Sequence, residues 1–451
     1  MTETVDAVVV GLGPGGETLA GELAEAGLEV VGVESHLVGG ECPYYGCIPS
    51  KMLIRAADSL AEARRVPRLA GTSTVSPDFP QVAERIRTEA TTDWDDEAAA
   101  RRFTDKGGRL VRGRARISGP RSVHVDGQEF TAKRALVLNP GTEPAVPPVP
   151  GLADTPYWTN REALRAVRAP RSLAVLGGGA IGLELAQGYA RFGTEVLVVE
   201  AAETLLPAEE PAAGRLLAEV LREEGLTVRT GASLRGVRHQ DGAFTLELDE
   251  GAHTVERLLV STGRRTDLRA LGVAELGLDP DARGLEPDGQ LRIAPGVWAI
   301  GDVTGKGAFT HISTYQAAIA TRAILGQPGP DAEYHAVPRV TFTDPEVGAV
   351  GLTEAQARDR GMSVRTGMAE LPESPRGWIH GAGNAGFVKL VADRDTDTLV
   401  GATSAGPSGG EMLSGLTVAV HAGTPISRLR RMILAYPTFH RVMETALDQL
   451  D

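Results

Sequence analysis

The chain has 451 residues, of which 42% are hydrophobic and 23% are charged, and this length predicts about two to four domains rather than one core. Its formal net charge of −13 argues against nucleic acid as the main partner, because phosphate binding requires a basic surface. No apolar run approaches the roughly 18 residues of a membrane span, and the acidic N-terminus does not resemble a signal peptide. We therefore expect a cytoplasmic protein with neither a nucleic-acid nor a membrane partner.

The first predicted unit is a strand, a glycine-rich turn, an amphipathic helix and a second strand, in AVVVGLGPGGETLAGELAEAGLEVVGVE (7–34). Its glycines, Gly11, Gly13 and Gly16, have the G-x-G-x-x-G spacing. The first permits a tight turn, the second lets the backbone approach a pyrophosphate, and the third packs helix against sheet. The helix N-terminus offers N–H groups to the phosphates, and Glu34 is placed to accept a hydrogen bond from a ribose hydroxyl. The pattern predicts a dinucleotide site.

Both cysteines of the chain follow, in GGECPYYGCIPSK (39–51). Cys42 and Cys47 lie where the chain leaves this first nucleotide-binding fold. The next residues, IPSKMLIRAADSLAEA, have helical apolar spacing, with Pro49 suited to the first turn. Cys47 would then begin a helix, where the dipole lowers a thiol pKa, and Lys51 would stand one turn further on the same face.

These cysteines have three interpretations. Two cysteines in a reducing compartment do not make a structural disulfide framework, which leaves a redox pair, a metal fragment or an accident. A zinc site needs four ligands, and the sequence has neither a second cysteine pair nor an H-x3-H partner. We therefore expect no metal site, and the neighbouring nucleotide motif favours redox activity over an accidental pairing.

The segment TTDWDDEAAARR (91–102) is rich in charge. This composition is typical of a charged helix or a solvated face. We expect no chemistry from it.

A second copy of the nucleotide pattern is present in LAVLGGGAIGLELAQGYARFGTEVLVVE (173–200). Its glycines are Gly177, Gly179 and Gly182, and it also ends in a glutamate, Glu200. Two copies predict two bound dinucleotides. A carboxylate at Glu200 would bond a 2′-hydroxyl but repel a 2′-phosphate, and the residues after it, AAETLLP, supply no cation, so NADH is favoured over NADPH. If Glu200 is only a solvated strand end, the preference stays open.

Two dinucleotides and a cysteine pair also suggest a path for electrons, because a nicotinamide passes hydride to a flavin and a flavin passes two electrons to a disulfide. The motif G-G-x-C-x4-C-x-P-S-K resembles the redox-active segment of class I pyridine nucleotide-disulphide oxidoreductases, the family of dihydrolipoamide dehydrogenase, glutathione reductase, mycothione reductase and mercuric reductase. The resemblance covers nearly the whole chain. Four further segments carry it: LVLNPGTEPAVPPVPG (136–151), with Asn-Pro where Ala-Thr is usual, STGRRTDL (261–268), GVWAIGDVTGKGAFTHISTYQA (296–317) and VTFTDPEVGAVGLTE (340–354).

The resemblance implies an α/β fold with two Rossmann-like dinucleotide-binding domains, for FAD and NAD, and a C-terminal α+β dimerisation domain. We expect the FAD domain in residues 1–150 and 266–330, the NAD domain in 151–265, and the dimerisation domain in 331–451. The partner implied is a second copy of the chain, in a homodimer with a shared active site.

The resemblance also implies roles for single residues. Cys47 would face the flavin as the charge-transfer thiolate, and Cys42 would be the interchange thiol that attacks substrate. Lys51 and Glu184 would pair near the flavin, and Asp302 would hold the ribityl chain of FAD. Other cofactor-binding positions implied are Gly141, Gly263 and Gly301. From the residues alone, Asp302 is equally a turn cap and Glu184 a helix-surface carboxylate.

The C-terminus departs from the family pattern at the residues that would carry the acid/base chemistry. Members carry His-Pro-Thr and then Glu as an acid/base dyad, whereas AYPTFHRVMETALDQL has Tyr436 and Arg441 at those places. A tyrosine, with a reference pKa of about 10, donates a proton at neutral pH but is a poor base. His440 and Glu444, one helical turn apart, are candidates for a relocated pair, although His440 is equally a solvated first-turn residue.

Three functions follow from this sequence. The first is an NADH-dependent reductase whose Cys42–Cys47 disulfide reduces a disulfide or another thiol-reactive small molecule. The second is a flavoenzyme that reduces a quinone or another non-disulfide metabolite, a role that tolerates loss of the dyad. The third, a binding role as the flavoprotein subunit of a complex, is least favoured because both nucleotide motifs are intact.

Overall fold

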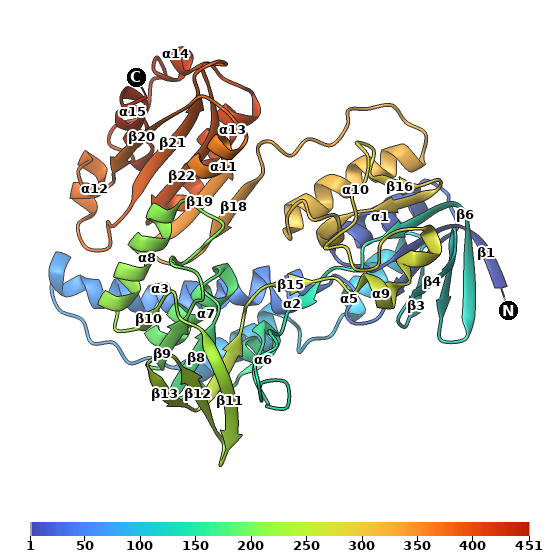
Figure 1. The fold of residues 1–451 in the computed structure, drawn as a ribbon, viewed down its shortest axis with the longest axis horizontal. Helices are drawn as coiled ribbons and strands as arrows, with labels where there is room; N and C mark the ends of the chain where they lie inside the picture. The colour runs from blue at the N-terminus through green and yellow to red at the C-terminus, as the bar shows by residue number, and fades with distance from the viewer. Residues whose placement is uncertain (1, 451) are drawn as a thin grey trace. The chain divides into compact units, whose positions relative to one another are not determined.

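The computed structural model describes residues 2–450, which form two compact units (Figure 1). Unit 1 comprises the chain up to Pro49, Ile86–Ala145 and Arg264–Tyr334. Unit 2 comprises Ser50–Arg85, Val146–Gly263 and the chain from His335 on. Helix α3 (Cys47–Leu69) begins in unit 1 and continues in unit 2.

Unit 1 contains one large sheet with helices packed on it. Its other elements are β1 (Thr2–Val10), α1 (Pro14–Glu25), β2 (Val30–Glu34), α2 (Glu41–Tyr45), the π-helical turn η1 (Ile86–Ala90), α5 (Glu97–Asp105), β3 (Arg109–Arg112), β4 (Arg116–Gly119), β5 (Ser122–Val125), β6 (Gln128–Leu138), β7 (Glu143–Pro144), β15 (Arg264–Arg265), α9 (Leu268–Leu271), η2 (Val273–Leu276), β16 (Arg292–Ala294), β17 (Val297–Ala299), η3 (Gly301–Thr304) and α10 (Thr310–Ile324).

The parallel strands of this sheet run in the order β17-β6-β1-β2-β3. The unit β1-α1-β2 confirms the strand, turn, helix and strand predicted for residues 7–34. Strands buried on both faces are typical of parallel sheets. This explains the nearly continuous apolar run at the start of the chain.

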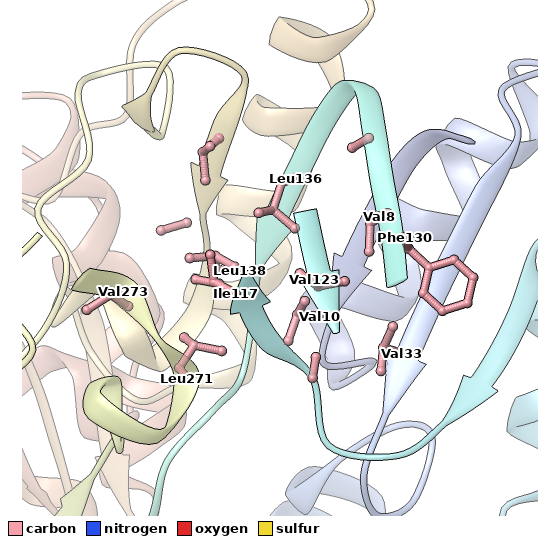
Figure 2. Packing of buried hydrophobic residues seen from close by; sticks show 14 of the residues in the cluster. Val8, Val10, Val33, Ile117, Val123, Phe130, Leu136, Leu138, Leu271 and Val273 are labelled. Atoms are coloured by element: carbon pink, nitrogen blue, oxygen red, sulfur yellow. The ribbon is translucent and has the colours of Figure 1, made fainter. Parts of the chain in front are cut away.

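Alternate residues of these strands enter two different cores. Val8 of β1 lies beside Leu136 of β6 and Val10 beside Leu138, and all four face the cluster drawn in Figure 2. Their neighbours along the strands, such as Val9, point to the opposite face, where α1, α5 and α10 pack. Each fully buried valine or leucine contributes roughly 1.5–3 kcal/mol, so both faces hold the turn after β1 in place.

Unit 2 contains a second parallel sheet, an antiparallel three-stranded sheet and an antiparallel five-stranded sheet. Its elements besides α3 are α4 (Phe79–Arg85), α6 (Asn160–Arg165), β8 (Ser172–Leu176), α7 (Ala180–Arg191), β9 (Glu195–Val199), α8 (Pro211–Glu223), β10 (Thr227–Arg229), β11 (Leu234–Gln240), β12 (Ala243–Leu248), β13 (Gly251–Val255), β14 (Arg257–Val260), β18 (Pro338–Thr341), β19 (Glu346–Gly351), α11 (Glu354–Asp359), β20 (Val364–Glu370), α12 (Pro375–His380), β21 (Phe387–Asp393), β22 (Thr398–Gly406), α13 (Gly409–His421), α14 (Ile426–Leu429), η4 (Phe439–Arg441) and α15 (Val442–Asp448).

The parallel sheet of unit 2 has the order β10-β9-β8-β14, and β8-α7-β9 repeats the β1-α1-β2 pattern as predicted. The C-terminal residues form the antiparallel sheet β18-β19-β22-β21-β20. Helices α13 and α15 bury their apolar faces in the same core as β21 and β22. The α/β class predicted from the sequence, with a separate α+β module at the C-terminus, is confirmed.

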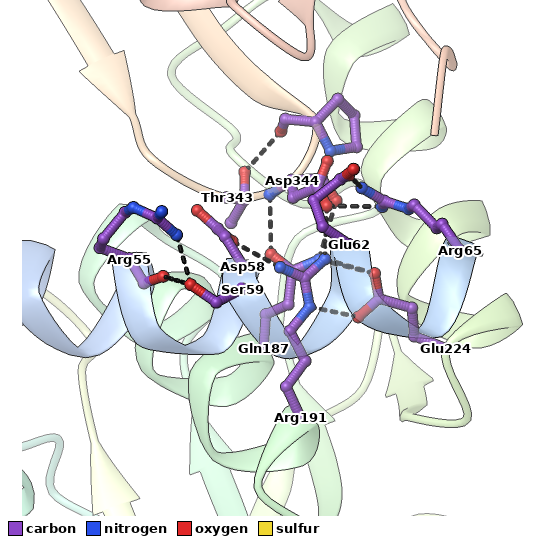
Figure 3. Close-up of polar contacts among 11 residues, drawn as sticks. Arg55, Asp58, Ser59, Glu62, Arg65, Gln187, Arg191, Glu224, Thr343 and Asp344 are labelled. Atoms are coloured by element: carbon purple, nitrogen blue, oxygen red, sulfur yellow. Dashed lines mark hydrogen bonds and ion pairs between the residues drawn. The ribbon is translucent and has the colours of Figure 1, made fainter. Parts of the chain in front are cut away.

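A buried ion cluster joins α3, α7 and the loop after β18 within unit 2 (Figure 3). Arg191, the last residue of α7, is 3% exposed and binds three carboxylates. Its guanidinium lies 2.5 Å from Asp58, 2.6 Å from Glu224 and 2.7 Å from Asp344. Burial raises the pKa of Asp58 to about 6, so this carboxylate is largely ionised only above that pH.

We expect Arg191→Met to lower the free energy of unfolding by about 3–5 kcal/mol at pH 8, because it removes the cation from Asp58 and Glu224 and leaves Asp344 with Arg65 alone. Urea denaturation measures the loss. The matched control is Arg238→Met, whose ion pair with Glu247 is exposed on both sides and should contribute less than about 1 kcal/mol. Equal losses of unfolding free energy in the two variants would contradict the stabilising role assigned to Arg191.

Candidate active site

The turn after β1 is closed to side chains at two glycines and open at the third. A Cβ on Gly11, where φ is +89°, would lie 2.0 Å from the carbonyl oxygen of Asn139. A Cβ on Gly16 would lie 2.0 Å from the carbonyl oxygen of Gly11. At Gly13 the nearest atom is 3.5 Å away, so space remains there for a ligand. This is the arrangement that a pyrophosphate needs at a helix N-terminus.

The turn after β8 has the same properties. A Cβ on Gly177 would lie 2.6 Å from the carbonyl oxygen of Ser261, and one on Gly182 would lie 2.4 Å from the Ser261 hydroxyl. Around Gly179 no described atom comes within 4 Å of that position. Both predicted glycine triads therefore fit a dinucleotide for the same steric reason.

The two predicted glutamates also occupy matching places. Glu34 accepts hydrogen bonds from the N–H groups of Leu12 and His36, both at 2.8 Å. Glu200 accepts from the N–H groups of Gly178 and Ala202. Each carboxylate thus ties the glycine-rich turn to the residue two places after the glutamate itself. It is held where a ribose would approach it.

Side chains that sequence reasoning missed complete the first turn. Asn139 is buried and donates from Nδ2 to the carbonyl oxygen of Gly11 at 3.1 Å. Ser313 of α10 accepts from the N–H of Gly15 at 3.1 Å. Gln316, on the next turn of α10, accepts from the N–H of Gly301 at 2.6 Å. Asn139 stands where the sequence departs from the family pattern, which was the one available signal.

Asp302 lies in η3 and accepts a hydrogen bond from the Thr142 hydroxyl at 2.6 Å. Arg264 donates to that hydroxyl at 2.8 Å and to the Thr142 carbonyl at 2.6 Å. Gly141 and Gly301, both predicted cofactor positions, have positive φ and flank this group. Gly263, the third such position, has a φ of +130° and directly precedes Arg264.

The two cysteines lie on successive short elements of unit 1. Cys42 is in α2, Cys47 begins α3 as predicted, and Gly46 separates the two helices. Both are half-buried free thiols. Their mutual hydrogen bond and burial raise the pKa of the Cys42 thiol above its ordinary value. The pair is therefore close enough to interact, and Cys42 needs a base to become a nucleophile.

Thr310, the first residue of α10, is a further member of this group. Its hydroxyl lies 3.5 Å from Sγ of Cys47, and its hydrogen bond lowers the pKa of Cys42. The Cys47 sulfur thus meets the N-termini of two helices, α3 and α10. Helix N-termini favour negative charge on a nearby group.

Lys51 and Glu184 form the predicted ion pair within unit 2. Nζ of Lys51 lies 2.7 Å from Glu184, which is buried, and 4.6 Å above the ring centroid of Phe342. The second carboxylate oxygen of Glu184 accepts from the N–H of Phe342 at 2.9 Å. Glu184 is therefore not a helix-surface carboxylate.

Comparison with known proteins identifies the family. Residues 5–321 match the family model described as pyridine nucleotide-disulphide oxidoreductase, and residues 337–447 match its dimerisation domain. The chain belongs to this family. Its FAD- and NAD-binding domains and its dimerisation domain make it a flavoprotein oxidoreductase of the disulfide reductase type.

Similarity to individual proteins supports the same family assignment. The chain is 34% identical to the dihydrolipoyl dehydrogenase of Thermus scotoductus, over 99% of this chain and 98% of the relative. It is 34% identical to the mercuric reductase of Acidithiobacillus ferrooxidans, over 95% of this chain and 79% of the relative. Among solved structures, the Cu(II) complex of the HOCl-induced flavoprotein disulfide reductase RclA of Escherichia coli is 28% identical with a TM-score of 0.86, over 100% of both chains. LpdA of Mycobacterium tuberculosis is 25% identical with a TM-score of 0.85, over 99% of this chain and 100% of that one.

FAD and a pyridine nucleotide are typical of this pyridine nucleotide-disulphide oxidoreductase family, and its dimerisation domain suggests a homodimer. None of the helices within residues 2–450 combines the length and the apolarity that crossing a bilayer requires.

His440 and Glu444, the candidates for a relocated acid/base pair, do not contact each other in this structure. Glu444 binds Arg441 instead, at 2.6 Å, because both face the same side of the short helical turn. The Arg441 guanidinium lies 5.3 Å from the ring centroid of Tyr436, which is 67% exposed. Tyr436, Arg441 and Glu444 therefore form a chain of contacts in the place of the family dyad, and His440 is exposed beside it.

Residues 97–102 begin α5 (Glu97–Asp105), which agrees with the expected charged helix, whereas residues 91–96 form a turn. This segment contacts the cysteine loop, because the Trp94 indole donates to the carbonyl oxygen of Tyr44, between the two cysteines, at 3.1 Å. Nothing in a run of charged residues signals such a contact.

We expect Thr310→Val to raise the pKa of Cys42 further, because it removes a hydroxyl that lowers this pKa. Alkylation of Cys42 by iodoacetamide at pH 7.5 should slow by about tenfold, the effect of one hydrogen bond to a charged group. Mass spectrometry of the labelled peptide measures the rate. Thr310→Ser keeps the hydroxyl and should react at the wild-type rate; an equally slow serine variant would contradict the assignment.

Proposed function

We propose that this chain is an NADH-dependent flavoprotein reductase whose Cys42–Cys47 pair passes two electrons to a disulfide or another thiol-reactive small molecule. The observation that carries the proposal is the pair itself. The two thiols lie close enough for Cys47 to raise the pKa of Cys42, and Cys47 lies against the N-terminus of α10. A structural role would not need two thiols within reach of each other.

The residues that would hold the cofactors are those of the two turns. Gly13 and Glu34 would receive the pyrophosphate and ribose of FAD, with Asp302 toward the ribityl chain, and Gly179 and Glu200 those of NADH. FAD, when bound, accepts hydride from NADH and supplies two electrons to the disulfide. Lys51, held by Glu184, would supply a fixed positive charge beside the flavin.

The exchange at the cysteines balances in two steps. The Cys42 thiolate attacks one sulfur of the substrate disulfide, which forms a mixed disulfide and releases the first substrate thiol. Cys47 then attacks Sγ of Cys42, which releases the second thiol and restores the Cys42–Cys47 disulfide. With the two electrons from NADH, the sum is NADH, one proton and one disulfide giving NAD⁺ and two thiols.

In these steps, protons would be transferred by groups other than the His-Glu dyad of the family. Because the pKa of Cys42 is raised, its thiolate fraction increases as the pH rises. In the homodimer proposed below, the Tyr436 hydroxyl of the second copy would be suited to protonate the first leaving thiolate, with Arg441 packed on its ring and Glu444 orienting Arg441. A tyrosine is a poor base at neutral pH, so we expect disulfide reduction to be faster at pH 9 than at pH 7.

Reduction of a quinone or a similar acceptor is the second candidate. The observation that favours it is that Tyr436 and Arg441 replace the dyad and Glu444 is engaged by Arg441. Electron transfer to a quinone needs no base at Cys42. Reduction of Hg(II), the activity named for several relatives, is not proposed, because the chain has no cysteine beyond this pair.

An anaerobic titration of the FAD-loaded protein with NADH tests the proposal. We expect two thiols to appear and a long-wavelength charge-transfer band to develop while the flavin stays largely oxidised. Cys42→Ser should lower disulfide reduction by at least about 10³-fold, because the nucleophile is lost, whereas quinone reduction should survive. If the flavin bleaches with one NADH and no thiols emerge, the pair is not redox-active and the quinone candidate stands.

The coenzyme preference for NADH rests on Glu200 and on a cation that the tertiary structure brings beside it. The N–H of Glu200 donates to the carbonyl oxygen of Arg229, at the end of the neighbouring strand β10. The Arg229 side chain is bound to Glu250 at 2.8 Å. The charge of Arg229 is thus balanced by Glu250, which supports rejection of a 2′-phosphate.

We expect Glu200→Gln to shift the ratio of kcat/KM for NADPH to that for NADH upward by about tenfold or more, because the repelling charge is removed. Reduction of ferricyanide measures both rates without knowledge of the substrate. Glu195→Gln, at the exposed opposite end of β9, is the control and should leave the ratio unchanged. An unchanged ratio in Glu200→Gln would show that this carboxylate does not face the ribose.

We also propose that the active site is shared in a homodimer. The C-terminal module exposes large apolar side chains: Ile433 at 100%, Trp378 at 76% and Tyr436 at 67%. Trp378 lies on α12, and α12 contacts η4 through His380 and Phe439, whose rings are 5.6 Å apart. Exposed apolar surface of this kind marks interaction sites. A fully active monomer in analytical ultracentrifugation would contradict this proposal.

A further inference from the structure

The turn of residues 91–96, between η1 and α5, has an unusual backbone. Thr92, Asp93 and Trp94 have φ values of +49°, +59° and +56°. Single residues other than glycine visit this left-handed region only occasionally, and three in succession are rare. Such a conformation persists only where the surrounding contacts impose it.

Contacts with the preceding π-helical turn impose it here. The Thr91 hydroxyl is buried and donates to the carbonyl oxygens of Ile86 and Arg87, both at 3.1 Å. The N–H of Asp93 donates to the carbonyl oxygen of Arg87 at 2.6 Å. The Arg87 side chain lies 3.3 Å from the Asp93 carboxylate. The turn is therefore a built element rather than a loose loop.

Its first contact with the cysteine loop is made by Trp94. The Nε1–H group donates to the carbonyl oxygen of Tyr44 at 3.1 Å. Tyr44 is buried in α2, two residues after Cys42 and three before Cys47. A carbonyl near the end of a short helix has no partner further along that helix, and the indole supplies one. The contact fixes the segment between the two sulfurs.

The second contact of the turn is made by Asp96, which binds the start of the cysteine loop, before Cys42. Its carboxylate accepts from the N–H of Val38 at 2.6 Å and from both terminal nitrogens of Arg112, at 2.7 and 2.8 Å. Arg112 in turn donates to the carbonyl oxygen of His36 at 2.8 Å. Although burial raises the pKa of Asp96, the bonds from Arg112 and Val38 outweigh it and lower the pKa overall, so the charge is stable.

We propose that the 91–96 turn is a positioning element for the Cys42–Cys47 pair, and that it sets the equilibrium between the dithiol and the disulfide. This inference rests on the proposed redox role of the pair. A disulfide forms only when the two Cα atoms lie within about 7 Å of each other. By holding the loop before Cys42 and between the cysteines, the turn keeps the reduced pair in that range and favours the disulfide.

The equilibrium is measured against glutathione. One glutathione disulfide oxidises the two thiols to the Cys42–Cys47 disulfide and is itself reduced to two glutathione thiols. Loss of one hydrogen bond that holds the closed loop should lower this equilibrium constant by about fivefold. The sulfurs and their immediate surroundings are unchanged, so a purely structural role elsewhere would leave the constant unaltered.

Trp94→Phe tests the proposal, because it keeps an aromatic side chain at this position and removes the Nε1–H donor. FAD-loaded protein is equilibrated anaerobically with glutathione buffers, and free thiols are trapped and counted by mass spectrometry. Trp298→Phe is the matched control: the Nε1 of Trp298 is buried in the same unit without a hydrogen-bond partner within the described part of the chain. Asp96→Asn, which weakens the second contact independently, is measured in the same way.

A fall of about fivefold in Trp94→Phe, with FAD content and the Trp298→Phe constant unchanged, supports the proposal. A fall in Asp96→Asn supports it even if Trp94→Phe loses its flavin. Wild-type constants in both Trp94→Phe and Asp96→Asn would overturn it while leaving the proposed function intact. If the wild-type protein forms no Cys42–Cys47 disulfide at any glutathione ratio, the proposed function fails and this inference fails with it.

Discussion

The close backbone approach at the two glycine-rich turns is the constraint on which the rest of the structure depends. The position of a Cβ on Gly11 is only 2.0 Å from the carbonyl oxygen of Asn139, so β1, α1 and the end of β6 meet without any side chain between them. Glu34 then ties the turn to β2 through backbone N–H groups. Both the cofactor site and the start of the cysteine loop are fixed by this joint, and unit 2 repeats it around Gly177.

The cysteine loop shows how a redox site is assembled from short pieces. Helices α2 and α3 are separated by Gly46, and each carries one thiol. Contacts from elsewhere in unit 1 hold these pieces: Thr310 of α10 touches Cys47, and the 91–96 turn holds the loop through Trp94 and Asp96. Two separate segments of unit 1 therefore contact the loop that carries the dithiol.

The C-terminal segment shows how the same scaffold can carry altered proton chemistry. Tyr436, Arg441 and Glu444 form one line of contacts where relatives of the resembled family carry a His-Glu dyad. The nucleotide turns and the thiol pair are retained, whereas the base is not. In the proposed function, loss of a base would slow the steps that begin with a thiol of raised pKa, such as Cys42, and would leave hydride transfer to the flavin unaffected. A preference among electron acceptors would follow from this difference.

The sequence by itself determined the two strand-turn-helix-strand units, their glycines and glutamates, the helix that begins at Cys47, and the family. Each is a local pattern, in which residues a few positions apart report backbone geometry and the periodicity of burial. Only the tertiary structure decided that Glu444 binds Arg441 rather than His440, that Arg229 lies beside Glu200, and that Trp94 reaches Tyr44. Long-range hydrogen bonds and ion pairs leave no periodic trace in the sequence, because a single polar residue serves equally well on a solvated face. Which partner it finds depends on packing between segments far apart in the chain.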